Sequence, residues 1–272
     1  EEILLHGNQL GKDEAYFAVG GLALSDNDQI LAYATDTVSR RNYTVYFKNL
    51  ATGELLADKI ENTEGGSYAW SSDSQYFFYL LRDPQTLLAS KVFRHQMGTS
   101  STEDVLVYEE KNEECYMGLS RSKSKEYIFS VSSQQGVYSE YRMLKTDNPT
   151  GKFEVFHPGE RGLEYFIEHQ LDRFLIRTNF QDATNFQLMA CPQVGPTDKS
   201  QWQTVVAHRP DVFIEDFDAT TEWVALEVKT NGLSQIQLIR FPSQYWHKCT
   251  LSESYPSLQL YFINLPKLGF GI

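Results

Sequence analysis

The sequence predicts an all-β protein, a β-propeller of four-stranded antiparallel blades with about five blades present. The main observation is a strand-like run, rich in Tyr, Phe, Val and Ile, that recurs at steps of 46, 51, 46 and 50 residues. It begins at Ile30, Tyr76, Tyr127, Arg173 and Trp223. Recurrence at such a fixed period indicates one supersecondary unit repeated along the chain.

Each of these runs is the second of four predicted strands. An apolar strand and a polar turn precede it, as in SDNDQ at 25–29 and SSDSQ at 71–75, and a third strand and a weaker fourth strand follow it. Turn residues such as Asp, Asn and Ser bond to the local backbone, whereas aromatic and β-branched residues suit a pleated, half-buried surface. Small sheets of this kind, arranged radially, bury their faces against one another.

The repeats predict one propeller domain over residues 1–250. The blades lie near 16–60, 65–110, 113–157, 163–208 and 211–250. The segment 251–272 does not continue the cycle, since from Ser254 onward its only charged residue is Lys267. Three alternatives stay open for it: an atypical cap strand, the end of a fragment, or an out-of-frame tail.

Composition excludes several classes of function. The chain has 272 residues, a net charge of -12 and a pI near 5.0, which disfavours nucleic acid as a partner. No apolar stretch approaches eighteen residues and the amino end is no signal peptide, so we expect no membrane contact. Cys115, Cys191 and Cys249 form no CxxC pair, which suits a reducing compartment and buried thiols. We therefore expect a cytoplasmic protein.

Motifs for catalysis and for cofactors are missing from the sequence. There is no GxSxG, HExxH or glycine-rich phosphate loop and no catalytic triad, so we expect no cofactor and no metal site. The histidines do not cluster, and His95 and His169 fall in predicted strands as hydrogen-bonded structural groups. Two carboxylate-rich segments could supply a glycosidase pair: Glu109-Glu110 with Glu113-Glu114, and Glu215-Asp216 with Asp218. Solvated strand ends explain them as well.

Many phrases of the sequence, in order, resemble one family. They include EEILLHGNQLGKDEAYFAVGG at the start, DPQTLLASKVFRHQMGT, and GLEYFIEHQLDRFLIRTN. Together they resemble the propeller of the prolyl oligopeptidase family (S9), most closely its oligopeptidase B (protease II) branch, over Glu1 to about Thr250. The resemblance implies a seven-bladed propeller that caps an α/β-hydrolase domain with a Ser-Asp-His triad. It implies a serine endopeptidase that cleaves short peptides after Arg or Lys.

By this resemblance the chain is truncated and lacks the catalytic domain. It would open on the last strand of blade one and contain blades two to six. The expected function is that of a substrate-gating domain, inactive by itself, whose partners are the hydrolase domain and short basic peptides. We also expect self-association through the open terminal blades. Two alternatives are a stand-alone propeller for binding or scaffolding and, less favoured, a five-bladed glycosidase.

One rim of the propeller is the predicted interdomain surface. Loops between the second and third strands of each blade share a rim with the connections between blades, and the resemblance turns this rim towards the hydrolase domain. We hypothesise that five residues of this rim form charge pairs across or near the interface: Asp36, Arg40, Arg41, Glu61 and Glu64. The alternative is solvated surface charges, worth less than about 1 kcal/mol each.

Overall fold

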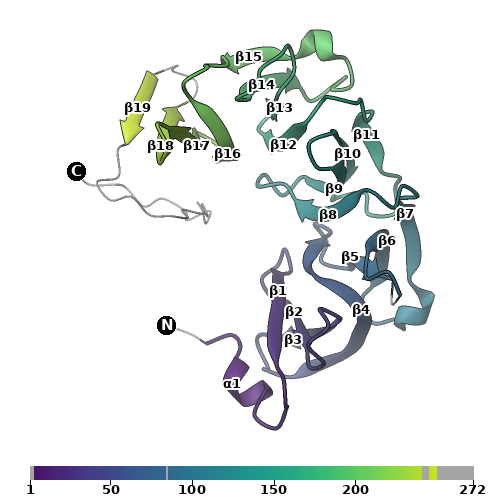
Figure 1. Cartoon of the computed structure of the whole chain (residues 1–272). Coiled ribbons are helices and arrows are strands. Elements are labelled where there is room, and N and C mark those ends of the chain that lie inside the picture. Colours follow the sequence, from purple (N-terminus) through teal and green to yellow (C-terminus); the bar gives the residue numbers. More distant parts are fainter. Residues whose placement is uncertain (1–2, 84, 241–244, 250–272) are drawn as a thin grey trace. The chain divides into compact units, whose positions relative to one another are not determined.

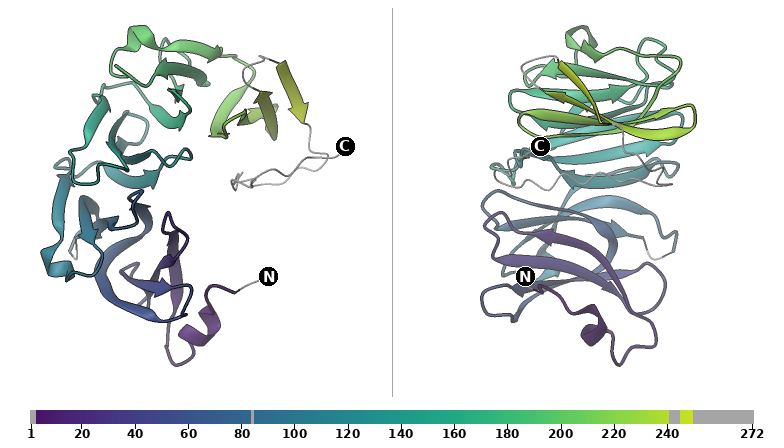
Figure 2. Two further views of the ribbon diagram at one scale, coloured as in Figure 1. Left: turned by 180° about the vertical axis from the view of Figure 1, so that it is seen from behind. Right: turned by 90° about the vertical axis from the view of Figure 1, so that its left-hand side faces the viewer.

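The computed structural model describes residues 3–83, 85–240 and 245–249, the last five by their backbone only. Almost all of the regular structure in these residues is β-strand (Figure 1 and Figure 2). The chain forms two compact units. The first comprises the residues up to 135 together with 139–158, and the second comprises 136–138 together with the residues from 159 onward. The proposed tail, 251–272, lies outside the described residues.

The first unit contains a short helix, α1 (Gly7–Leu10), and two antiparallel sheets. The larger sheet has seven strands in sequence order: β1 (Ala18–Leu24), β2 (Ile30–Asp36), β3 (Tyr43–Asn49), β4 (Leu55–Trp70), β5 (Tyr76–Arg82), β6 (Ala89–Gln96) and β7 (Val105–Glu109). A 3-10 turn, η1 (Ser101–Glu103), precedes β7. The smaller sheet has four strands: β8 (Tyr116–Arg121), β9 (Tyr127–Gln134), β10 (Tyr138–Lys145) and β11 (Glu154–His157).

The second unit contains two four-stranded sheets with neighbouring strands in sequence order. One consists of β12 (Tyr165–Gln170), β13 (Arg173–Thr178), β14 (Gln187–Pro192) and β15 (Gln203–Val206), with a 3-10 turn, η2 (Lys199–Gln201), before β15. The other consists of β16 (Phe213–Ala219), β17 (Trp223–Thr230), β18 (Leu233–Arg240) and β19 (Tyr245–Cys249). These strands confirm the predicted all-β propeller of antiparallel four-strand cycles. None of the helices in the described residues has the length and apolar character needed to cross a bilayer.

The connection between the first two cycles differs from the prediction. The sequence predicted a separate rim connection between these two blades, but residues 61–67 lie inside the 16-residue strand β4. Thr63 pairs with Tyr43 in β3 on one side and with Leu81 in β5 on the other, so one strand serves both cycles. Gly65 allows this, since its φ is 99° and a Cβ atom there would lie 2.1 Å from the Tyr43 ring.

Three of the tight turns share one hydrogen-bond pattern. In the turn between β1 and β2, the Ser25 hydroxyl donates to Asn27 Oδ1 at 2.7 Å and accepts the amide of Ile30 at 2.9 Å. The Asn27 side chain in turn accepts the amide of Gln29 at 3.1 Å. The serine and the asparagine thereby satisfy backbone groups that would otherwise lack partners at the turn.

The turns between β4 and β5 and between β8 and β9 repeat this pattern. Ser71 and Ser122 take the place of the first serine and accept the amides of Tyr76 and Tyr127 at 2.9 and 3.0 Å. Each turn has one residue in the left-handed region: Asp28 (φ 57°), Ser74 (φ 58°) and Lys125 (φ 64°). The recurrence seen in the sequence is therefore also a recurrence of local hydrogen bonding.

The second strand of each cycle, β2, β5, β9, β13 or β17, has consecutive buried residues and is therefore buried on both faces over much of its length. Every residue of β2 from Leu31 to Asp36 is buried, which a strand with one solvated face would not show. In the first unit, the Phe47 ring on β3 lies edge-on to Trp70 and Phe77, at 5.8 and 5.0 Å between ring centroids. Phe47 is fully buried, so the first two strand cycles share one aromatic core.

The two sheets of the second unit pack in the same way. Leu175 and Leu188 of one sheet and Ile214, Phe217 and Leu226 of the other belong to one buried apolar cluster. Burial of such apolar side chains contributes about 1.5–3 kcal/mol each, which makes face-to-face packing the main source of stability in these small sheets.

A buried histidine joins the first two cycles through hydrogen bonds. His95 on β6 is fully buried, and its Nδ1 and Nε2 atoms lie 2.7 Å from Asp104 and 3.0 Å from Asp58, which belongs to β4. The Tyr79 hydroxyl donates to Asp104 at 2.8 Å, and the Gly98 amide donates to Asp58 at 2.5 Å. This confirms His95 as a hydrogen-bonded structural group, as the sequence predicted.

The charge of His95 follows from this arrangement. Burial alone would lower the pKa of the imidazole, but the hydrogen bonds with Asp104 and Asp58 outweigh it and hold the pKa above its ordinary value of 6.5. A pKa raised by folding means that the protonated imidazole stabilises the native state. This stabilisation is complete below the unfolded pKa and is lost as pH rises through the native pKa.

We expect His95→Leu to lower the free energy of unfolding by about 3 kcal/mol, because two buried carboxylates lose their shared partner. Urea unfolding from about pH 6 to about pH 9 measures this. The loss should be larger at the acidic end, where the wild-type imidazole is protonated. His208→Leu, at a partly exposed histidine, is the matched control and should cost less than about 1 kcal/mol. Equal losses in both variants, or a loss independent of pH, would contradict this account.

Candidate functional site

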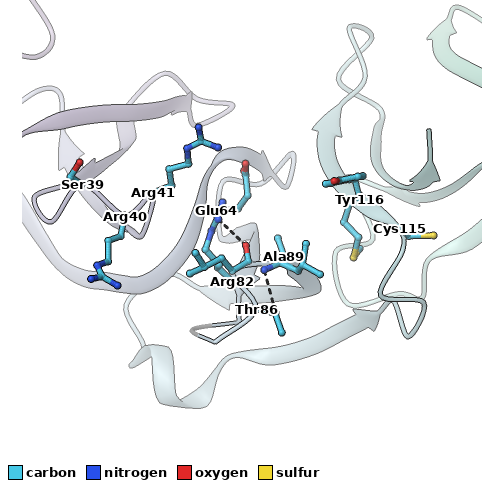
Figure 3. Close-up of a pocket in the computed structure, with 12 residues that line it drawn as sticks. Ser39, Arg40, Arg41, Glu64, Arg82, Thr86, Ala89, Cys115 and Tyr116 are labelled. Atoms are coloured by element: carbon cyan, nitrogen blue, oxygen red, sulfur yellow. Dashed lines mark hydrogen bonds between the residues drawn. The ribbon is translucent and has the colours of Figure 1, made fainter. Parts of the chain in front are cut away.

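A pocket of about 600 Å³ opens on the first unit, at the rim predicted from the sequence. It is lined by residues 39–41 from the loop after β2, by Glu64 from β4, by Arg82 and residues 86–89 around the loop after β5, and by residues 115–117 at the start of β8. Figure 3 shows the loop with Ser39, Arg40 and Arg41 on one side and Cys115 and Tyr116 on the other. Segments far apart in the sequence thus meet at one place.

A buried carboxylate holds the loop between β2 and β3. Asp36 is only 1% exposed, and its two oxygens accept the backbone amides of Val38 at 2.8 Å, Arg40 at 3.0 Å and Arg41 at 2.8 Å. Arg41 itself lies in the left-handed region, with φ at 54°. Since the loop amides converge on Asp36, the backbone is fixed while the arginine side chains stay on the outside.

The loop between β5 and β6 uses a carboxylate in the same way. Asp83 Oδ1 accepts the amides of Thr86 and Gln85, both at 2.8 Å, and these bonds hold the pKa of the Asp83 carboxyl below its ordinary value. One guanidinium nitrogen of Arg82 donates to the Leu87 carbonyl at 2.8 Å, across the same loop. This loop is therefore shaped by side chains at its own start.

Among the described residues that line the pocket, Glu64 is the one acidic side chain. Its Oε2 atom accepts the amides of Gly66 and Ser67, each at 3.1 Å. The carboxylates of Asp36, Glu64 and Asp83 thus all bind backbone amides of their own segments.

The arginines have unused donors. Among the described residues, Arg40 and Arg41 form no ion pair, and both are exposed. The buried Nε atom of Arg82 has no hydrogen-bond partner there either. In Figure 3, Arg40 points away from Tyr116, so Arg41 and Arg82 are the more central of the three. Three guanidinium groups against one carboxylate give the pocket lining an excess of positive charge.

Apolar groups complete the pocket. Tyr116 and Leu87 are 66% and 45% exposed, and Leu88 and Met117 also line the wall. Cys115 and Cys191 are both buried. Burial raises the pKa of the Cys191 thiol to about 12. The two cysteines whose side chains the structure describes therefore match the buried thiols expected from the sequence.

The predicted rim residues have different roles in the structure. Arg40, Arg41 and Glu64 line the pocket, and Asp36 lies beneath the loop and bonds to amides instead of to a guanidinium. Glu61 lies apart from them in an exposed pair with Lys59 at 2.7 Å. Their interdomain role stays a prediction. Sequence reasoning missed Tyr116, because it read this residue as an ordinary strand position.

Two carboxylates of the glycosidase alternative, Glu215 and Asp216, have ordinary structural roles in the structure. Glu215 pairs with Lys229 at 3.2 Å, and the Asp216 carboxylate accepts the amide of Phe217 at 2.8 Å, while burial raises the pKa of Asp216. Within the described ranges, no group of three or more His, Cys, Asp or Glu side chains could hold a metal ion.

We expect Asp36→Asn to destabilise the protein by about 1–2 kcal/mol, because the amide offers one acceptor oxygen to three backbone donors. Trypsin cleavage after Arg40 and Arg41 should accelerate as the loop loosens. Glu61→Gln, at an exposed carboxylate, is the control and should change stability by less than about 0.5 kcal/mol. Urea unfolding and timed trypsin digestion measure both effects, and identical behaviour of the two variants would argue against Asp36 as the support of the loop.

Comparison with known sequences finds one family of peptidase domains and related peptidases. Residues 1–263 match the family model for the prolyl oligopeptidase N-terminal beta-propeller domain. Dipeptidyl aminopeptidase BI of Pseudoxanthomonas mexicana is 41% identical over 240 residues, which cover 88% of this chain and 33% of that protein. Protease 2 of Moraxella lacunata is 30% identical over 286 residues, covering 100% of this chain and 41% of the relative. The chain thus spans about a third to two fifths of the length of these relatives.

Solved structures agree with the sequence comparison. The structure of oligopeptidase B from Leishmania major superimposes with a TM-score of 0.82 at 26% identity, over 89% of this chain and 34% of that one. With the match of residues 1–263 and the antiparallel four-strand cycles described above, the chain belongs to the family of prolyl oligopeptidase N-terminal beta-propeller domains.

Proposed function

We propose that this chain is the substrate-gating propeller of a serine peptidase that cleaves short peptides after Arg or Lys. In this proposal an α/β-hydrolase domain supplies the triad, and the propeller restricts access to it. The chain by itself is inactive, because bond cleavage needs groups that its sequence does not contain. The proposed location is the cytoplasm.

The match of residues 1–263 to a propeller domain of peptidases is the observation that carries the proposal. The similarity to dipeptidyl aminopeptidase BI and to oligopeptidase B supports a peptidase, since both names describe cleavage of peptides. Preference for Arg or Lys rests on the resemblance to the oligopeptidase B branch alone. In the proposal, carboxylates outside this chain recognise the basic side chain.

The rim loops support a role at a domain interface. Loops that act at interfaces need fixed backbones and exposed side chains, and Asp36 and Asp83 give the first unit two such loops. In the proposal this rim faces the hydrolase domain. A rigid rim would admit flexible peptides and exclude folded proteins, because a folded chain cannot thread past it.

The alternative of a stand-alone binding propeller is not excluded by the fold, since propellers serve many functions. The family match favours the peptidase, because the similar curated proteins named above are a peptidase and a protease.

A fluorogenic peptide with an Arg-Arg sequence before the cleaved bond tests the proposal. We expect no hydrolysis by this chain alone and hydrolysis by the complete product of its gene, sensitive to a serine-directed inhibitor. The reading frame of that gene should encode a GxSxG segment downstream. Hydrolysis by the chain alone, or a complete product without a hydrolase domain, would contradict the proposal.

A further inference from the structure

We propose that the pocket around Arg41 and Arg82 is a binding site for a carboxylate carried by a peptide chain. The inference goes beyond substrate gating, because it assigns a ligand chemistry to this surface of the propeller. It depends on side chains of the first unit alone and needs no second domain.

The donors of the pocket carry the argument. A guanidinium matches a carboxylate through two parallel N–H donors, which makes arginine the preferred residue for this recognition. Arg41 has all of its donors unused among the described residues, and Arg82 uses one nitrogen for Leu87 and retains others. The pocket thus offers a carboxylate more than one guanidinium.

The neighbouring carboxylates do not neutralise these arginines by direct contact. Glu64 Oε2 and Asp83 Oδ1 bind amides of their own segments, and Asp36 lies buried under the loop. A loop held in this way requires little ordering when a ligand arrives. Affinity therefore suffers less from lost side-chain and loop entropy than it would on a mobile loop.

The apolar part of the pocket lining indicates a peptide instead of a small inorganic anion. Tyr116, Leu87 and Met117 present apolar surface beside the guanidinium groups, and 600 Å³ is a typical volume for a pocket that holds an organic ligand. A ligand with a carboxylate next to an apolar side chain fits this lining, because the carboxylate can bind the guanidinium groups while the apolar side chain packs on the apolar residues. Such a group occurs at the carboxyl terminus of a short peptide and at an acidic side chain within a longer chain.

Isothermal titration calorimetry of the full chain at low ionic strength tests the site with four peptides. Acetyl-Gly-Leu-Gly-Leu with a free carboxyl terminus is compared with its amide, and acetyl-Gly-Glu-Gly-Leu-amide with the same peptide carrying Gln. We expect about tenfold tighter binding for at least one carboxylate peptide over its neutral counterpart. A preference in the first pair identifies a peptide terminus as the ligand, and a preference in the second identifies an acidic side chain.

Substitutions of single arginines test whether the preference for carboxylate peptides depends on the pocket. Arg41→Asn should abolish the preference, and asparagine tolerates the left-handed backbone at this position. Arg41→Lys should keep part of it, because the charge remains and the two-pronged geometry is lost. Arg161→Asn, the same change at an exposed arginine outside the pocket, is the control and should keep the preference in full.

No preference in either pair of peptides, or a preference that survives Arg41→Asn unchanged, would overturn the inference. Circular dichroism and the melting temperature check that each variant is folded. The outcome is independent of the peptidase proposal, which hydrolysis by the complete gene product tests separately.

Discussion

A carboxylate taken out of water must be surrounded by donors, and this requirement governs the first unit. Asp36 is 1% exposed and Asp58 is 8% exposed. Backbone amides donate hydrogen bonds to the Asp36 carboxylate, and the His95 imidazole is hydrogen-bonded to the Asp58 carboxylate. Asp36 thereby fixes a rim loop, and Asp58 joins β4 to His95 on β6. Burial of these charges would cost several kcal/mol without such partners, so each loop or strand that supplies them is held in place.

The excess of positive charge in the pocket lining follows from the same requirement, although the chain as a whole carries a net charge of -12. Asp36, Glu64 and Asp83 accept amides of their own segments, whereas Arg40 and Arg41 have no acidic partner among the described residues. The local surface charge is therefore set by which side chains the loops use internally. The net charge of the chain alone would have suggested a negatively charged surface here.

Much of the fold could be predicted from the sequence, because the four-strand cycles repeat the same kinds of turn and strand residues. Ser25, Ser71 and Ser122 mark equivalent turns, and the strand-like runs that follow them become β2, β5 and β9. The continuous strand β4 could not be predicted from the sequence, because its polar segment around Gly65 has the composition of a loop. Its extended form depends on pairing with both neighbouring strands, which is tertiary information.

Only part of the candidate site could be predicted from the sequence. Topology brought the loops of Arg41 and Arg82 to the same rim, but the role of Asp36 depends on the direction of amides in the folded loop, which no sequence pattern reports. Tyr116 carried no signal, since a strand-initial tyrosine is usual in a sheet.

Residue-resolved hydrogen exchange of the native protein tests most directly whether a buried carboxylate holds the rim. The account predicts strong protection of the Val38, Arg40 and Arg41 amides, which bond to Asp36, and rapid exchange of the Thr37 and Ser39 amides in the same loop. Equally rapid exchange of all five amides would show that the loop is not held by Asp36 and would contradict the account.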